Sequence, residues 1–204
     1  LTNNGNVGIP VNDLAFHHNP LAMSVQMVVV LFQIIAVFTY GIINTSSAQV
    51  GLGKTLRQLG KMPVFYCLVL GLICNVQGIQ VPEFIWIPVS AAANGMLALA
   101  LVAIGAQIAA VKLGQNGMKV LLSSAVRLLV SPALSFGLIQ LFQLDGVVAQ
   151  TLWIASAMPS SRNSAALALE YNNEPEFAAQ AVLASTLLSC ITLTVAVYLA
   201  PMLF

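Results

Sequence analysis

Long apolar segments separated by short polar connections set the pattern of this chain. A helix needs roughly 20 mostly apolar residues to cross the hydrocarbon core of a bilayer. Six segments reach about that length, and a shorter apolar piece at 7–10 is interpreted as the end of another helix. The six segments are residues 21–43, 62–80, 86–111, 119–142, 147–170 and 177–204. The pattern predicts an all-α, polytopic membrane helix bundle that forms one transmembrane domain over residues 1–204.

The composition agrees with a membrane protein and excludes several other classes. Of the 204 residues, 59% are hydrophobic and only 6% are charged, whereas about a quarter of the residues of a soluble domain are charged. Such a chain is not disordered, and the lack of a basic patch argues against a nucleic-acid partner. No hydrolase, metalloprotease or phosphate-binding motif occurs. We therefore expect no enzyme activity, no cofactor and no metal site.

The charges of the connections alternate along the chain. The connection at 44–61 contains Lys and Arg and the one at 112–118 is flanked by Lys112 and Lys119, whereas the turns at 81–85 and 143–146 contain only acidic charges. Lys and Arg are enriched in cytoplasmic loops. The alternation predicts a multi-pass protein of the plasma (cytoplasmic) membrane, with loop 44–61 in the cytoplasm and the C-terminus outside.

The first residues include the run NNGNVGIP, whose composition disfavours a regular helix. Pro10 removes a backbone donor and clashes with the preceding turn. Asn3 and Asn6 offer amide donors and acceptors to freed backbone groups or to a ligand. We interpret the run as the exit half of a broken membrane helix, with Asn3, Asn6 and Pro10 as candidate substrate-binding residues. The alternative is an ordinary helix end at the membrane surface, where Asn and Gly are common.

A second break is predicted where the run AMPSSRNS places a proline and several polar side chains at mid-membrane depth. A cation at that depth is costly unless it is paired or faces water, and Arg162 could hold a carboxylate through two hydrogen bonds. The alternative is that Arg162 snorkels or pairs with Glu170, about two helical turns further along. Arg127, nearer the cytoplasmic end of its segment, is expected to snorkel. The candidate binding residues of this break are Pro159, Ser160, Ser161, Arg162 and Asn163.

The loop charges imply that the two broken helices run in opposite directions. The helix that ends at Pro10 runs outward and the helix around Pro159 runs inward, and each is followed by a short polar loop and a long apolar helix. Two broken helices in opposite orientation are typical of inverted-repeat secondary transporters, whose substrate sites lie where the breaks meet.

These runs resemble the auxin efflux carrier family, which includes the plant PIN exporters and many bacterial permeases. The stretch from Asn3 to Pro10 is similar to the family's N-x(4)-G-x-P stretch. The stretch from Pro159 through Glu170-Tyr171-Asn172 to residues 184–189 is similar to its ninth and tenth helices. The order and spacing of these motifs carry the resemblance, which spans nearly the whole chain.

The resemblance implies two inverted five-helix repeats with two crossed broken helices. The chain, expected to be N-terminally truncated because it begins inside a motif, would hold the end of helix four through helix ten. Residues 1–43 would end the first repeat, 44–61 would form the cytoplasmic loop and 62–204 the second repeat. The resemblance also implies a homodimer, with Asn3, Pro10 and Pro159 at the crossover. The substrates would be organic anions such as auxin, malate or malonate.

We therefore predict a secondary transporter that moves organic anions, either mono- or dicarboxylates, by alternating access. Its expected partners are a small organic anion, the lipid bilayer, a coupling ion (H⁺ or Na⁺) and a second copy of the chain. One alternative is a cation-coupled bile-acid-type symporter of similar architecture. Another is a membrane sensor or assembly subunit that transports nothing.

Overall fold

The computed structural model describes residues 1–37, 40, 63–110 and 117–204. Every regular element in these residues is a helix, and they contain one isolated antiparallel bridge, between Thr2 and Ser160. The all-α prediction is confirmed. Loop 44–61 lies outside the described residues, so the boundaries drawn there between the two repeats stay predictions.

The predicted apolar segments appear as helices whose ends follow local sequence signals. Asn19 begins α2 by accepting a hydrogen bond from the backbone nitrogen of Leu21 (2.9 Å), and Pro20 follows at the first helical position, as expected for a helix start. The helices are η1 (Asn4–Gly8, π-helical), α1 (Ile9–Ala15), α2 (Pro20–Ala36), α5 (Pro63–Val76), α6 (Glu83–Ala110), α7 (Gly117–Ala125), η3 (Val126–Val130, π-helical), α8 (Ser131–Leu141), α9 (Gly146–Ser156), α10 (Arg162–Glu170) and α11 (Pro175–Leu203).

Two stretches of the described chain are long and apolar enough to cross a membrane as single helices. They are Gly117–Leu141, which joins α7, η3 and α8, and Pro175–Leu203, which is α11. The segment predicted at 147–170 is not one helix, because α9 ends at Ser156 and α10 begins at Arg162. The break expected around Pro159 is therefore present.

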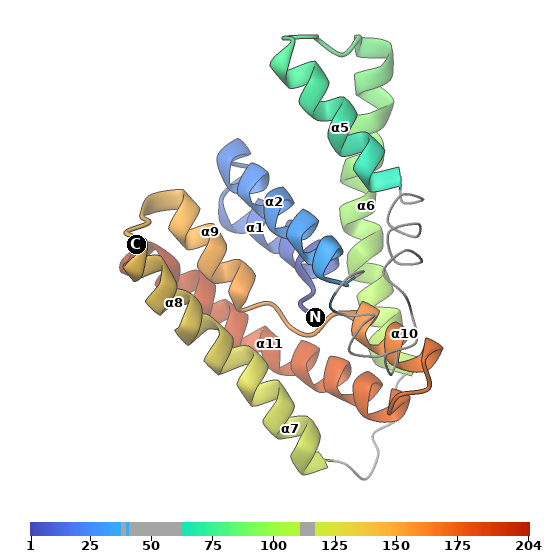
Figure 1. The fold of residues 1–204 in the computed structure, drawn as a ribbon, viewed down its shortest axis with the longest axis vertical. Helices are drawn as coiled ribbons and strands as arrows, with labels where there is room; N and C mark the ends of the chain where they lie inside the picture. Colours follow the sequence, from blue (N-terminus) through green and yellow to red (C-terminus); the bar gives the residue numbers. More distant parts are fainter. Residues whose placement is uncertain (38–39, 41–62, 111–116) are drawn as a thin grey trace.

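The apolar core lies between α8, α9 and α11, which pack side by side (Figure 1). Trp153 is buried in this core, and its indole nitrogen donates to the carbonyl oxygen of Pro132 at 3.1 Å. That bond satisfies the one polar atom of a large buried side chain. α2 lies against α9, so the first residues of the chain reach the connection between α9 and α10 (Figure 1).

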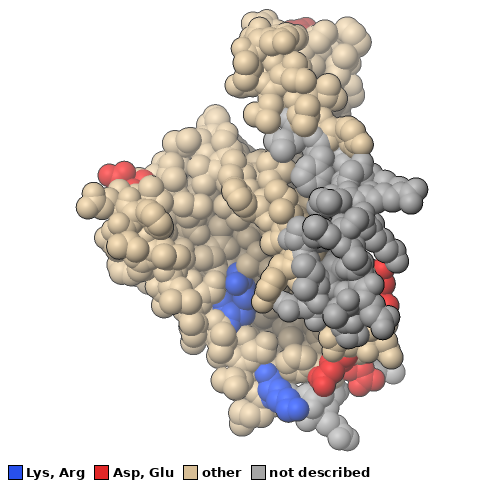
Figure 2. Space-filling view, viewed as in Figure 1, with Lys and Arg blue, Asp and Glu red and all other residues tan. Residues whose placement is uncertain are grey.

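Helices α5 and α6 form a hairpin whose far end stands away from the bundle, and α6 contacts η1 (Figure 1). Large apolar side chains on the hairpin, such as Phe84 and Trp86, are exposed. Figure 2 shows that the described surface on this face is almost entirely uncharged. Such a surface suits contact with lipid or with other membrane helices.

Candidate functional site

The two breaks lie side by side and are joined through their backbones. The backbone nitrogen of Asn3 donates to the carbonyl oxygen of Pro159 at 2.8 Å, and that of Ser161 donates to the carbonyl oxygen of Leu1 at 2.8 Å. The intervening Thr2 and Ser160 form the antiparallel bridge. Because a backbone that leaves the helix at membrane depth must find partners inside the protein, each break supplies partners to the other.

The first break is held by amide side chains from α2. Gln33 Oε1 accepts from the backbone nitrogen of Asn4 (3.1 Å) and from Thr2 Oγ1 (3.2 Å). Gln26 Nε2 donates to the carbonyl oxygen of Asn4 (2.8 Å), and Gln26 Oε1 accepts from Asn12 Nδ2 (2.6 Å). Gln26 and Asn12 are fully buried. Two neutral amides therefore stabilise the non-helical start and the π-helical turn that follows it.

Serine hydroxyl groups hold the second break from two sides. Ser185 Oγ, on α11, accepts from the backbone nitrogen of Ser160 at 3.1 Å. Ser161 caps α10 by accepting from the backbone nitrogen of Asn163 at 3.2 Å. The backbone nitrogens of Ser160, Ser161 and Asn163 thus all have partners within the protein.

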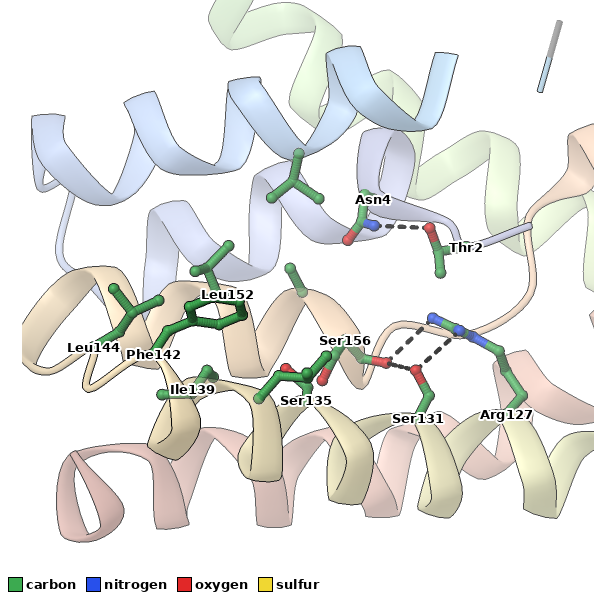
Figure 3. Close-up of a pocket in the computed structure, with 13 residues that line it drawn as sticks. Thr2, Asn4, Arg127, Ser131, Ser135, Ile139, Phe142, Leu144, Leu152 and Ser156 are labelled. Carbon is green, nitrogen blue, oxygen red and sulfur yellow. Dashed lines mark hydrogen bonds between the residues drawn. The ribbon is translucent and has the colours of Figure 1, made fainter. Parts of the chain in front are cut away.

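Arg127 also reaches the second break. Its Nε donates to the carbonyl oxygen of Met158 (3.0 Å), its Nη2 to that of Ser156 (3.2 Å) and its Nη1 to Ser131 Oγ (3.1 Å). Ser131 Oγ in turn donates to the carbonyl oxygen of Ser156 at 3.0 Å. Figure 3 shows Arg127, Ser131 and Ser156 converging in this way. The expectation that Arg127 snorkels to the cytoplasmic surface is wrong, because its guanidinium binds the carbonyl end of α9.

Two cavities flank the crossing and share part of their lining. The first, about 340 Å³, also touches Thr2 and Asn4 and extends along α8 to Phe142 (Figure 3). The second, about 570 Å³, also touches Ser160, lies along η3 and α8 and reaches Ser123 in α7. The lining residues that they share are Arg127, Ser131, Ser135, Leu138 and Ser156. Space is therefore present on both sides of one polar cluster.

Five of the eight candidate residues lie in or beside the crossing segments. Asn3 and Ser161 are almost fully buried and Pro159 is completely buried. Ser160 lines the second cavity, and Asn6 is half-buried in η1. Of the eight, Ser160 alone lines either of the two cavities described above.

The other three candidates have different surroundings. Pro10 is buried in the first turn of α1. Arg162 and Asn163 are exposed. Within the described part of the chain, Arg162 has no hydrogen bond or ion pair, so the pair with Glu170 that was the alternative interpretation is not seen there.

The sequence interpretation missed several lining residues, although they leave a recognisable signal. Ser123, Arg127, Ser131 and Ser135 recur every four residues in an otherwise apolar segment, and residues four apart share a helix face. A polar stripe at that spacing predicts one face turned away from lipid. No group of three metal-ligating side chains occurs among the described residues.

One comparison with known proteins bears on this chain. The family model described as Membrane transport protein matches residues 1–197, a range that includes both breaks. No curated protein and no solved structure matches the chain.

Proposed function

The chain belongs to this family of membrane transport proteins, of the auxin efflux carrier type, and we propose that it is a secondary transporter of organic anions. It would move mono- or dicarboxylates across the plasma membrane by alternating access. One observation carries the proposal, which is the antiparallel pairing of two broken helices beside two cavities. Breaks of this kind mark the substrate site of inverted-repeat transporters.

The cavities support the alternating-access part of the proposal. The first extends along α8 past its end at Leu141, the side predicted to be outside, whereas the second lies along η3 and α8 and reaches Ser123 in α7, nearer the side predicted to be inside. Both touch Arg127, Ser131 and Ser156. A substrate held by these shared residues would need only a small relative movement of the surrounding helices to face either side.

The charges support an anionic substrate. Among the described residues, the lining of the two cavities contains one cationic side chain, that of Arg127, and no carboxylate. A positive side chain in a cavity of low dielectric attracts anions strongly and repels cations. The proposal includes a homodimer and a coupling ion, H⁺ or Na⁺, as its further parts.

Flux through the full-length protein in proteoliposomes tests the function. Labelled indole-3-acetate, malonate and malate are offered in turn, with protein-free vesicles as the control. We expect flux of at least one of them, and its dependence on a Na⁺ or H⁺ gradient identifies the coupling ion. An absence of flux for every anion offered contradicts the proposed function.

Replacement of Asn3 by Ala tests the position of the site. The backbone bond from Asn3 to Pro159 survives this change, whereas the side-chain amide beside the crossing is lost. We expect the KM for the transported anion to rise about tenfold, because a buried amide that supports the crossing beside the substrate is lost. Asn75→Ala, on the exposed face of α5, is the matched control and should leave KM unchanged. Equal KM values for the two variants contradict the placement of the substrate site beside Asn3.

A further inference from the structure

Arg127 has hydrogen-bonding capacity that the described chain does not use. A guanidinium group carries five N–H donors, one on Nε and two on each terminal nitrogen. Nε donates to Met158, Nη1 to Ser131 and Nη2 to Ser156. One N–H on each terminal nitrogen therefore has no partner within the described residues. The spare donors lie on a side chain that borders both cavities.

Arg127 also lacks a counter-charge in the described part of the structure. The ion pair found there joins His18 to Asp13, in the connection between α1 and α2 and away from the crossing. The groups bound to Arg127 are two carbonyl oxygens and a hydroxyl, which are neutral. A partly buried cation in a membrane protein is costly without an anion or water beside it. The arrangement leaves a place for an anion from outside the chain.

The other hydrogen-bond donors near the crossing are less available to an anion than Arg127 is. The backbone nitrogens of Ser160, Ser161 and Asn163 are already bonded. Arg162, the cation expected from the sequence to bind a carboxylate, is exposed and lines neither of the two cavities. Of the two arginines near the second break, Arg127 is the one that lies in the cavity lining.

We propose that Arg127 binds the carboxylate group of the transported anion through its two spare N–H donors. This inference rests on the proposed function, since the bound anion is the substrate of the carrier. The contacts to Ser156 and Met158 hold the guanidinium at the carbonyl end of α9 and fix its orientation. Because Arg127 borders both cavities, the carboxylate remains on one residue while access changes from one side to the other.

The test compares carboxylates with their neutral amides, which have similar shape. Binding of indole-3-acetate and indole-3-acetamide, and of malonate and malonamide, is measured on the full-length protein in detergent by calorimetry. Thermal unfolding without ligand reports whether each variant is folded. We expect the unaltered protein to prefer the carboxylate in at least one pair by about tenfold or more. In Arg127→Gln the ratio of the affinity for the carboxylate to the affinity for the amide should fall to near one.

Arg162→Gln is the matched control, because it removes a nearby arginine that lines neither cavity. We expect it to retain the preference of the unaltered protein. A purely structural role of Arg127 would weaken acid and amide binding together and leave their ratio unchanged, and that result overturns the inference. If Arg127→Gln does not fold, Arg127→Met decides, because methionine is also uncharged, and an unchanged ratio in the methionine variant overturns the inference.

The same measurement separates this inference from the function on which it rests. Binding of an acid to the unaltered protein, combined with an unchanged ratio in both Arg127 variants, overturns the role of Arg127 and leaves the transport of organic anions standing. Failure of the unaltered protein to bind or transport any acid offered overturns both.

Discussion

The two broken helices meet at one crossing but are stabilised by different chemistry. The first break is held by Gln26 and Gln33 of α2, the helix that follows it in the chain. The second is held by Ser185 of α11 and by Arg127 of η3. Neutral amides thus support one break, whereas a cation and a hydroxyl group support the other.

The difference assigns the two breaks different tasks. Gln26 bonds Asn12 within a buried cluster, and Gln26 and Gln33 also bind the backbone of Asn4, which makes that side suited to fixed geometry. The second break contains a cation with spare donors, which makes that side suited to binding charge. The proposed anion carrier needs both properties, a stable crossing and a group beside it that binds negative charge.

The largest effect is expected when the amide cluster of the first break is opened by Gln26→Leu. The substitution removes the side-chain donor to the carbonyl oxygen of Asn4 and leaves the Nδ2 of Asn12 without a partner in a buried site. Each buried unsatisfied group costs roughly 1–3 kcal/mol, so the free energy of unfolding should fall by about 3 kcal/mol. Chemical denaturation of the full-length protein in micelles measures this change in the free energy of unfolding.

Gln140→Leu is the control for this change, because Gln140 is exposed on α8. Its effect should stay within about 0.5 kcal/mol. If the two leucine variants are equally stable, the first break does not depend on its amides, and the contrast between the breaks disappears.

A smaller effect is expected at Gly8, which lies against the same cluster. A methyl group added at Gly8 would clash with Gln26 Nε2 and lie 3.2 Å from Asn4 Oδ1. Because Gln26 is fixed by two hydrogen bonds, it cannot move aside freely, and overpacking of this kind costs about 2 kcal/mol. The melting temperature of Gly8→Ala should therefore fall.

Gly5→Ala is the matched variant in the same π-helical turn. No described atom lies within 4 Å of a methyl group placed there, so this variant should be as stable as the unaltered protein or slightly more stable. Equal melting temperatures for the two alanine variants would show that the cluster around Gln26 is loosely packed.

Much of the crossing could be predicted from the sequence, because prolines and asparagines in apolar segments mark places where a helix must end. The loop charges then predicted opposite directions for the two broken helices. Which arginine reaches the crossing could not be predicted from the depth of each arginine in the membrane alone. Arg162 is closer to Pro159 along the chain, yet it is exposed, whereas Arg127 arrives from another helix.

The direction of a side chain around its helix was the missing information. Arg127 lies in η3, a π-helical turn just before Pro132. Such a turn has more residues per turn than an α-helix, so it shifts the side chains around the axis relative to the α-helical register. The stripe from Ser123 to Ser135 indicated a polar face, but only the packing of η3 beside the α9–α10 connection shows what that face contacts.

The smallest effect is expected at Ser185, the hydroxyl support of the second break. Ser185→Ala removes the acceptor for the backbone nitrogen of Ser160, and one such bond contributes about 1 kcal/mol. Ser189→Ala is its control, because Ser189 Oγ donates only to Thr186 within α11. Denaturation of both variants should show a clear loss of stability for Ser185→Ala alone. A loss as large as that of Gln26→Leu would mean that one hydroxyl group supports the second break as strongly as the amide cluster supports the first, and that result contradicts the contrast between the breaks.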